Sequence, residues 1–255
     1  MIKITLPDGS IKEFAQNSTA IDVAKSISEG LARNVISATF NDTTVETTTP
    51  LISDGSLVLH TFNDEGGKKA FWHSSAHVLA EAILSFHPDA KLTIGPAIDN
   101  GFYYDVDLGE EIISEKDFKD IENKFLEIAR GKHEFKMREV SKDDALSLYK
   151  NENNPYKVEL IENLTDGDIT FCDHSTFTDL CRGGHVPHTG IIKAIKIMNV
   201  AGAYWRGDSK NEMLQRIYGT AWGTKDDLQQ HLSMLEEAEK RDHRKLGREL
   251  DLFHV

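Results

Sequence analysis

Two pairs of side chains with the same spacing stand out as candidates for chemistry. His73 and His77 lie four residues apart, so on a helix both imidazoles project from one face. Cys181 and His185 repeat this spacing, but the two glycines between them favour a tight loop over a helix. Three imidazoles and one thiol together form a plausible tetrahedral zinc set.

The same four groups also suit other arrangements. A zinc ion could be coordinated by all four groups, or it could keep one coordination position open for a water. Without metal, the groups could line a pocket in which an imidazole orients or deprotonates a water. The chain has 11 histidines, so a scatter of histidines with no joint role is the remaining alternative. Spacing alone leaves all of these open.

The composition is that of a folded, non-membrane protein of one or two domains. With 255 residues, of which 39% are hydrophobic and 28% charged, the chain is long enough for a sizeable core. Its apolar runs are too short to span a bilayer. There is no export signal and there are only two cysteines, so we expect a cytoplasmic protein with reduced thiols. The net charge of −13 argues against a chain that coats nucleic acid nonspecifically.

One segment reverses this charge. Between Gly190 and Gly223 there are five basic residues against two acidic ones, and aromatic side chains stand among them. Such a segment could contact phosphates and bases, although ordinary solvated lysines in a strand-rich region would look the same. The residues that we group as the basic strip are Lys193, Lys196, Tyr204, Trp205, Arg206 and Arg216.

Residues 1–62 read as a small independent domain. Alternation from Ile2 and again from Ile11, with turn residues between them, predicts a hairpin. A capped helix that ends before Gly30 should follow it. Further strands are expected at 35–40, 44–46 and 56–61, and the whole describes a ubiquitin-like sheet on one helix. The polar, glycine-containing segment 63–69 is expected to be a linker.

Residues 70–224 form the second expected unit, in which helices and strands interleave irregularly. This irregularity predicts an α+β domain more than a doubly wound one. The Glu-, Lys- and Leu-rich tail predicts one long amphipathic helix from Lys225 to Leu250, within a final region 225–255. In the second unit, helices are expected at 70–86, from Ser114 to Gly131 and from Ser141 to just before Asn154, and strands at 101–107, 168–172, 193–200 and 213–218.

Several longer strings occur in an order typical of one family. They are HSSAH at 73–77, GPAIDNGFYYD at 95–105, DLCRGGHVP at 179–187, AYWRGD at 203–208, QRIYGTAW at 215–222 and RDHR at 241–244. The chain resembles the N-terminal half of a bacterial threonyl-tRNA synthetase over essentially its whole length. The resemblance implies a ubiquitin-like β-grasp (TGS) domain at 1–62, an α/β editing domain at 70–224 and a linker helix that leads to a class II catalytic core.

The catalytic core itself is not expected within these residues. A class II synthetase needs a further antiparallel sheet with ATP-binding arginines and an anticodon-binding domain, for which 255 residues leave no room. The resemblance therefore implies an excised part of such an enzyme or a freestanding editing protein. We do not expect ligase activity from it, nor the ATP, Mg²⁺ and zinc that the family holds in its catalytic domain.

The activity implied by the resemblance is proofreading. Serine lacks one methyl group of threonine, which is worth only about 1–3 kcal/mol in a pocket, so a second, hydrolytic site must supply further selectivity. Residues 70–224 would hydrolyse Ser-tRNA(Thr) to serine and tRNA(Thr). The implied partners are the acceptor end of the tRNA and the seryl group; the full-length enzyme would be a homodimer and this chain a monomer. The alternatives are a non-catalytic tRNA-binding module and a zinc-dependent ester hydrolase.

The resemblance also assigns roles to single residues. His73 would position the attacking water with the terminal ribose hydroxyl, and His77 would support it. Lys157 would bind a second water, relay a proton or stabilise negative charge, although on the residues alone Lys157 and Asp179 read as a surface ion pair. The basic strip would grip the acceptor arm and stack on its unpaired end. Cys181 and His185 would complete the polar wall, Asp179 would hold the serine ammonium, and Tyr104 and Gly95 would be pocket walls.

Two positions depart from the family pattern. The family usually has proline where Gly184 stands and often cysteine where Ser75 stands. Glycine predicts a freer loop before His185, whereas Ser75 only removes a thiol. The related alanyl-tRNA editing domains use a similar His and Cys set for zinc, whereas the threonyl family works without it. We therefore expect no metal and no cofactor, with zinc at His73, His77, Cys181 and His185 as the alternative.

Overall fold

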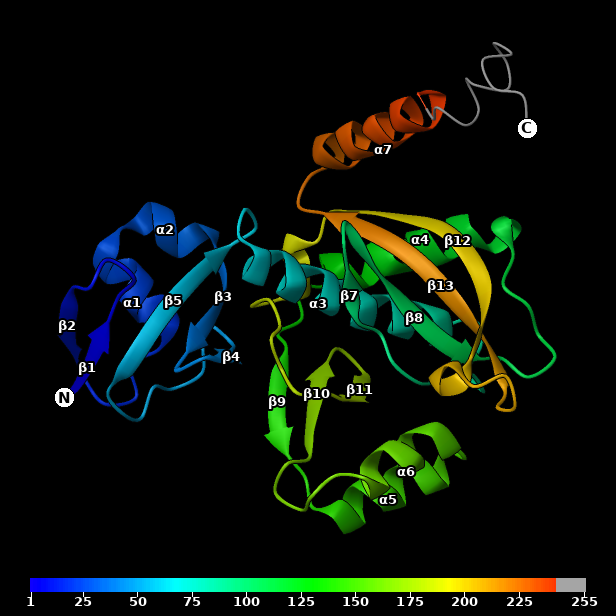
Figure 1. Ribbon diagram of the computed structural model, residues 1–255, viewed down its shortest axis with the longest axis horizontal. Coiled ribbons are helices and arrows are strands. Elements are labelled where there is room, and N and C mark those ends of the chain that lie inside the picture. The colour runs from blue at the N-terminus through cyan, green and yellow to red at the C-terminus, as the bar shows by residue number, and fades with distance from the viewer. Residues whose placement is uncertain (242–255) are drawn as a thin grey trace, which may run out of the picture.

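The computed structural model describes residues 1–241, which form two domains joined by one long helix (Figure 1). The strands of the first domain are β1 (Ile2–Thr5), β2 (Ile11–Phe14), β3 (Val35–Phe40), β4 (Thr43–Val45) and β5 (Gly55–Thr61). They form one sheet in the order β2-β1-β5-β3-β4, in which β1 and β5 are parallel. This is the expected β-grasp arrangement, and its core is built from the alternate inward residues of the strands and from one helix.

The helical part of the first domain differs in detail from the expectation. Helix α1 (Ala20–Ile27) begins at a capping box between Thr19 and Asp22 and buries Val23 against the sheet. It ends before Gly30, as expected, but Gly30 does not end it. Ser28 accepts from a backbone amide and starts a second helix, α2 (Glu29–Asn34), which contains that glycine.

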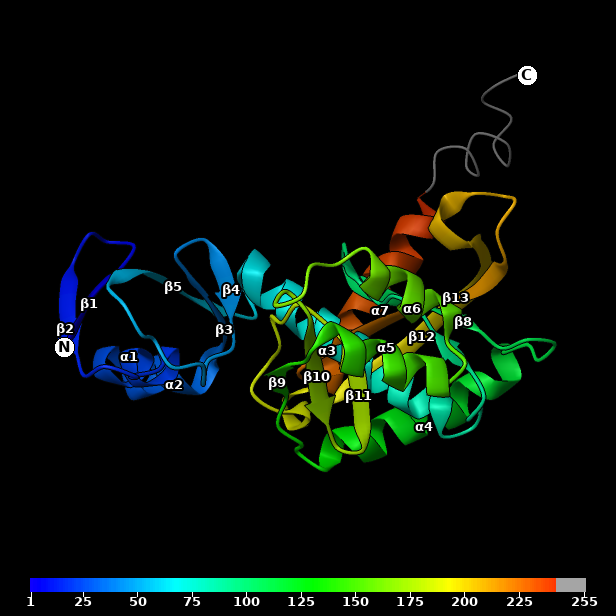
Figure 2. The same ribbon diagram turned by 90° about the horizontal axis from the view of Figure 1, so that it is seen from below.

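The linker expected at 63–69 is wrong from Glu65 onward, because helix α3 (Glu65–Leu84) begins there. The glycines that suggested flexibility serve close packing instead. A Cβ on Gly67 would lie 1.8 Å from the carbonyl oxygen of Thr61, and one on Gly66 would lie 2.9 Å from the ring of His60. The helix therefore starts directly against the end of β5 and continues into the centre of the second domain (Figure 2).

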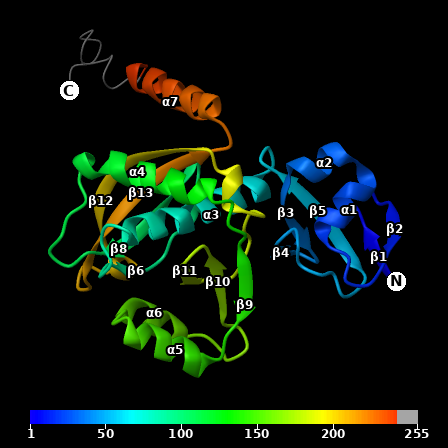
Figure 3. The same cartoon turned by 180° about the vertical axis from the view of Figure 1, so that it is seen from behind.

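The larger sheet of the second domain lies against α3. Its strands β12 (Ala194–Tyr204), β13 (Met213–Trp222), β8 (Gly101–Asp107) and β6 (Lys91–Leu92) are antiparallel neighbours in that order, and β7 (Ala97–Ile98) pairs with β8. Helices α3 and α4 (Glu115–Arg130) cover one face of this sheet (Figure 3). Because α3 is buried almost all round, groups on it can face enclosed space without leaving the core.

A smaller sheet completes the second domain. It consists of β11 (Phe177–Leu180), β10 (Thr170–His174) and β9 (Lys136–Glu139), with α5 (Lys142–Asn151) and α6 (Pro155–Glu162) beside it. The expectation that helix stops before Asn154 misses α6. The Asn154 side chain caps this helix and Pro155 occupies its first turn, a position that suits proline.

The last described helix is α7 (Lys225–Lys240), which lies against β12 and β13 and packs His231 on Trp222. The helix expected from Lys225 is thus present up to Lys240, and the remainder of that expectation, to Leu250 and on to 255, falls outside the described residues. None of the helices within residues 1–241 combines the length and the apolar character needed to cross a bilayer.

Candidate active site

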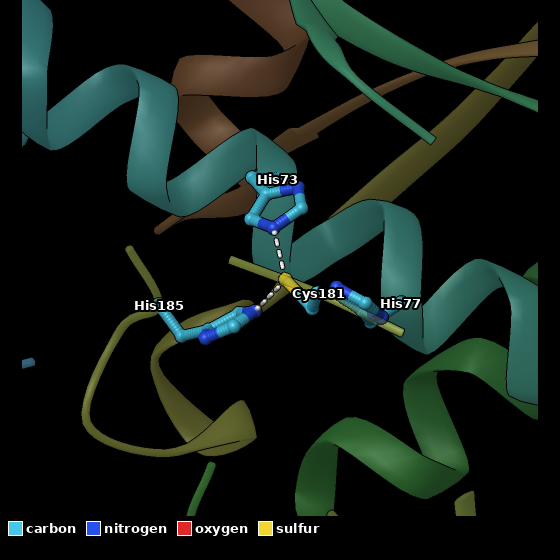
Figure 4. Close-up of side chains that lie close together, drawn as sticks. All are labelled: His73, His77, Cys181 and His185. Atoms are coloured by element: carbon cyan, nitrogen blue, oxygen red, sulfur yellow. Dashed lines mark hydrogen bonds between the residues drawn. The ribbon is translucent and has the colours of Figure 1, made fainter. Parts of the chain in front are cut away.

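The two pairs of side chains singled out by their spacing meet in the structure (Figure 4). His73 and His77 lie one helical turn apart on α3, and Cys181 and His185 lie on the loop that follows β11. One donor atom from each of the four residues lies within 4.8 Å of the others. Two segments more than 100 residues apart in the sequence therefore form a single polar cluster inside the second domain.

Cys181 links two of the imidazoles. Its Sγ lies 3.0 Å from Nε2 of His73 and 3.3 Å from Nε2 of His185. The other ring nitrogen of His73, Nδ1, lies 3.4 Å from the carbonyl oxygen of Gly95, which can only accept. That contact places the His73 proton on Nδ1 and makes Nε2 the acceptor of the Cys181 thiol proton.

Burial keeps His73, His77 and Cys181 in their uncharged forms. Desolvation and, secondly, the neighbouring His185 lower the pKa of His73 to about 3. Burial and then His73 hold the pKa of His77 well below its usual value. Burial raises the pKa of the Cys181 thiol to about 12. These three residues therefore offer two neutral imidazoles and a protonated thiol, which suits orienting a water better than nucleophilic attack by sulfur.

His77 has unused hydrogen-bonding capacity. Its side chain is buried, and neither ring nitrogen has a hydrogen-bond partner within the described residues. The nearest carboxylate oxygen, Oδ2 of Asp179, is 3.6 Å from Nδ1. Since a buried polar group normally finds a partner, a water, a substrate group or a metal ion is the expected occupant here.

The four residues also fit a zinc ion. With zinc–nitrogen bonds of about 2.0 Å and a zinc–sulfur bond of about 2.3 Å, the four tetrahedral ligand atoms would lie about 3.3–3.5 Å apart. The donor atoms already lie within 4.8 Å of one another, so small side-chain shifts would complete such a set. A zinc closed by all four groups would, however, leave no position for a reacting water.

A cavity of about 690 Å³ opens beside the cluster. It holds the catalytic and substrate residues expected from the sequence, with one exception. His185 is fully buried behind Cys181 and does not line the cavity, so its effect must pass through the thiol. The expected residues that do line the cavity are His73, His77, Gly95, Tyr104, Lys157, Asp179 and Cys181.

Lys157 and Asp179 are not the surface ion pair that the residues alone suggested. Their exposed fractions are only 2% and 3%, and Lys157 Nζ lies 2.5 Å from Asp179 Oδ1. Tyr104 donates from its hydroxyl to Asp179 Oδ2 at 2.7 Å, and Tyr149 lies 3.5 Å from Oδ1. Burial and the nearby Asp179 charge raise the pKa of Tyr104 well above its usual value, so its hydroxyl keeps its proton. An ammonium bound at Asp179 would share the carboxylate with Lys157.

Gly95 is a wall of the cavity for a specific steric reason. A Cβ at this position would lie 2.3 Å from the ring of Tyr104 and 3.1 Å from Cβ of Ala76 on α3. Only glycine lets this segment approach the buried Tyr104 ring so closely. Gly95 and Tyr104 thus form one rigid wall, which adjoins the imidazole of His73 on α3.

The loop around Gly184 is better fixed than a glycine in place of proline suggested. Gly184 has φ +87°, a conformation closed to proline, and its amide donates to Oε1 of Glu46 at 3.0 Å. The same carboxylate oxygen lies 3.1 Å from Nδ1 of His185. The other departure, Ser75, donates within α3 to the carbonyl of Phe71 and does not line the cavity.

Two residues of the site were not predicted from the sequence. Thr44 lines the cavity, and Glu46 contacts His185. Both belong to the first domain, where no motif marks them. Their role depends on how the domains pack, which no local pattern reveals.

The basic strip lies on β12 and β13 and on the turn between them, outside the cavity. Much of it is engaged within the protein. Arg216 makes two hydrogen bonds of 2.7 Å to Asp105, and Lys196 lies 3.2 Å from Glu122. Arg206 pairs with Glu159 at 2.8 Å, and the buried Trp205 donates to the same carboxylate. The remaining members, Lys193 and Tyr204, are exposed.

Comparison with known proteins identifies both domains. The TGS domain family matches residues 2–61, and the family described as the threonyl and alanyl tRNA synthetase second additional domain matches residues 167–218. The threonine–tRNA ligases of Flavobacterium johnsoniae and Flavobacterium psychrophilum are each 67% identical over 253 residues, and that of Cytophaga hutchinsonii is 53% identical. The chain matches the N-terminal region of bacterial threonine–tRNA ligases.

The similarity covers 99% of this chain but only 39% of the length of each of these ligases. The similarity thus covers both the β-grasp domain and the α+β domain that holds the cavity.

Proposed function

We propose that the second domain hydrolyses the ester of Ser-tRNA(Thr), as the editing region of a threonine–tRNA ligase. The observation that carries this proposal is the cavity itself. It places two neutral imidazoles beside a buried lysine, and one of them, His77, has no hydrogen-bond partner among residues 1–241. This combination is suited to water attack on an ester. In a full-length ligase, this hydrolysis would remove serine that has been attached in place of threonine.

In the proposed reaction, the two histidines orient the water and Lys157 stabilises the charge that develops. A water oriented by His73 and His77 adds to the ester carbonyl carbon, and Lys157 donates a hydrogen bond to the carbonyl oxygen as it becomes negative. The carbon–oxygen bond to the ribose then breaks and one proton of the water passes to the ribose oxygen. Serine leaves as a carboxylate, and the second proton of the water is released to solvent. With a pKa of about 3, His73 orients the water and does not hold a full proton, so the terminal ribose hydroxyl is suited to relay it.

Selectivity between serine and threonine would come from the wall formed by Tyr104 and Gly95. Asp179 would hold the serine ammonium next to the rigid surface formed by Tyr104 and Gly95. That surface has no room to yield, since Tyr104 is buried and bonded to Asp179 and Gly95 is in contact with its ring. The extra methyl group of threonine would meet this wall, whereas the hydroxymethyl group of serine would fit.

Deacylation assays test this function. We expect the protein to hydrolyse Ser-tRNA(Thr) and to leave Thr-tRNA(Thr) intact, because only the serine ester fits the wall. The matched control is the same protein with uncharged tRNA(Thr), which measures binding alone. Tight binding of tRNA without hydrolysis of either ester would contradict the proposal and favour a non-catalytic binding module.

A zinc-dependent hydrolase is the second candidate, favoured by the four donor atoms within 4.8 Å. Zinc would supply a Lewis acid and a more acidic water. We propose the metal-free form, because the sulfur–nitrogen distances of 3.0 and 3.3 Å describe a hydrogen-bonded cluster and a four-ligand zinc has no open position. Deacylation should therefore be unchanged after incubation with a chelator and removal of the metal, and a loss that zinc restores would overturn the metal-free form.

The tRNA contact of the basic strip should reside mainly in Lys193. Replacing Lys193 with alanine should weaken tRNA(Thr) binding and lower the slope of log affinity against log salt by about 1, because one phosphate contact is lost. Lys196→Ala is the matched control, since that lysine is already paired with Glu122 and should matter less. Equal affinity and equal salt slope in the Lys193 variant would remove the strip from the binding surface.

A further inference from the structure

The cavity is not enclosed by the second domain alone. The β3–β4 hairpin of the first domain lies on the side of that domain that faces the smaller sheet (Figures 1 and 2). Thr44, on β4, lines the cavity, and its Cγ2 lies 3.2 Å from where a Cβ on Gly184 would stand. The residue that follows β4, Glu46, reaches the loop that carries Cys181 and His185.

Glu46 is held in place as a charged acceptor. Its Oε1 accepts from the Gly184 amide at 3.0 Å and lies 3.1 Å from Nδ1 of His185, while Thr49 donates to Oε2 at 3.4 Å. Burial alone would raise the pKa of this carboxyl, but the hydrogen bond from His185, together with that from the Gly184 amide, outweighs burial and lowers the pKa below its usual value.

A carboxylate at this position decides which nitrogen of His185 carries a proton. Because an ionised carboxylate only accepts, Nδ1 of His185 must donate to it. Nε2 of the same ring then faces Sγ of Cys181, which in turn contacts His73 on the cavity wall. The ring is also fixed in orientation, since it stacks on Phe135 with centroids 5.2 Å apart and an interplanar angle of 6°.

The contact with Gly184 ties this arrangement to the particular residues of this chain. A proline at this position, as is usual in the family, would have no amide proton and could not adopt φ +87°. It could therefore not make the hydrogen bond to Glu46. A glycine at this position both frees the turn and provides the donor. The hydrogen bond to Glu46 thus restrains the loop at Gly184, where a proline ring would restrain it by its own rigidity.

We propose that the first domain completes the hydrolytic site through Glu46, a positioning residue that fixes the tautomer of His185 and the loop that carries Cys181. The inference rests on the hydrolysis proposed above and deepens it. It makes the TGS domain a structural part of the editing site, in addition to whatever else that domain binds.

The test compares Glu46→Ala and Glu46→Gln with Asp42→Asn in the whole chain. Asp42 lies in the turn of the same hairpin and has φ 63°, which asparagine also adopts readily, so this control removes one negative charge without touching the loop. Three quantities are measured: kcat and KM for Ser-tRNA(Thr), the ¹⁵N shifts of the His185 ring, and the thermal midpoint. Wild-type protein without tRNA provides the reference spectrum.

We expect Glu46→Ala to lower kcat by about 10- to 100-fold with little change in KM, as for other carboxylates that orient a functional histidine. The ring shifts should show loss of the single Nδ1–H tautomer. Glu46→Gln keeps an acceptor oxygen and should restore most of the rate and the tautomer, whereas Asp42→Asn should behave as wild type.

Unchanged kcat and ring shifts in Glu46→Ala would overturn the inference, as would an equal loss in Asp42→Asn. Should Glu46→Ala fail to fold, Glu46→Gln is the deciding variant. Wild-type kcat together with wild-type ring shifts in this variant supports positioning. Loss of the single Nδ1–H tautomer with unchanged kcat contradicts it. Absence of hydrolysis in the wild-type protein would refute the proposed function, and the ring shifts would still decide what Glu46 does.

Discussion

Replacing Asp179 with asparagine should lower the free energy of unfolding by about 3–5 kcal/mol and abolish deacylation. The side chains of Asp179 and Lys157 are almost wholly buried and lie 2.5 Å apart. Asparagine keeps the shape but leaves the ammonium of Lys157 buried without a counter-charge, which is the costly way to break such a pair. Denaturant unfolding measures the first effect, and hydrolysis of Ser-tRNA(Thr) measures the second.

The matched control is Asp173→Asn on the same small sheet. Asp173 pairs with Arg138 at 2.6 Å, but both side chains are partly exposed, so its loss should cost no more than about 1 kcal/mol. A double variant, Lys157→Met with Asp179→Leu, removes both charges and should regain much of the stability while remaining inactive. An unfolding midpoint in Asp179→Asn equal to that of the wild type would show that the pair does not hold the cavity together.

The second large effect is expected at His73, where alanine should lower kcat for deacylation by about 100-fold or more with KM nearly unchanged. His73 lines the cavity, and within the described part of the chain its nitrogens contact the Cys181 thiol and, at 3.4 Å, the carbonyl of Gly95. Without the imidazole, the attacking water loses its orienting group. His87→Ala is the control, since His87 lies just beyond the end of α3, outside the cavity, and pairs with Glu111.

The pH dependence of the wild-type rate provides a further readout of His73. A histidine with the ordinary pKa of 6.5 would become protonated as the pH falls through 6.5, and the rate would drop about tenfold per unit below it. Because burial lowers the pKa of His73 to about 3, the ring stays neutral and this loss should be absent between pH 8 and pH 5. An inflection near pH 6.5 that disappears in the His73 variant would contradict a buried, neutral role.

The parts of the site that could be predicted from the sequence are those with a local periodicity. His73 and His77 face one way because a helix repeats every 3.6 residues, and the glycines after Cys181 marked a tight loop. The first domain followed from its alternating strands and turns, and the structure confirms its β-grasp order. That the two segments meet was an expectation from the family resemblance, because no spacing rule connects a helix to a loop so far along the chain.

The parts that could not be predicted depend on long-range packing. On the residues alone, Lys157 read as part of a surface ion pair, and a helix was expected to end before Asn154. Proline in a first turn instead begins α6, which carries Lys157 inward. β9 was missed because Lys136–Glu139 is almost entirely polar and shows no buried alternation. Glu46 lies beyond any local pattern, since its partners become neighbours only when the two domains are packed together.

The size of the cavity has a consequence for accuracy. A space of about 690 Å³ is many times larger than a methyl group, so total volume cannot tell the two amino acids apart. The distinction must be made over one short stretch of wall, where Tyr104, Asp179 and Gly95 hold one another by buried contacts. In the proposed proofreading, discrimination between serine and threonine would therefore depend on the rigidity of this wall more than on the cavity volume. Warming that increases the mobility of the wall would lower this discrimination at temperatures well below the unfolding midpoint.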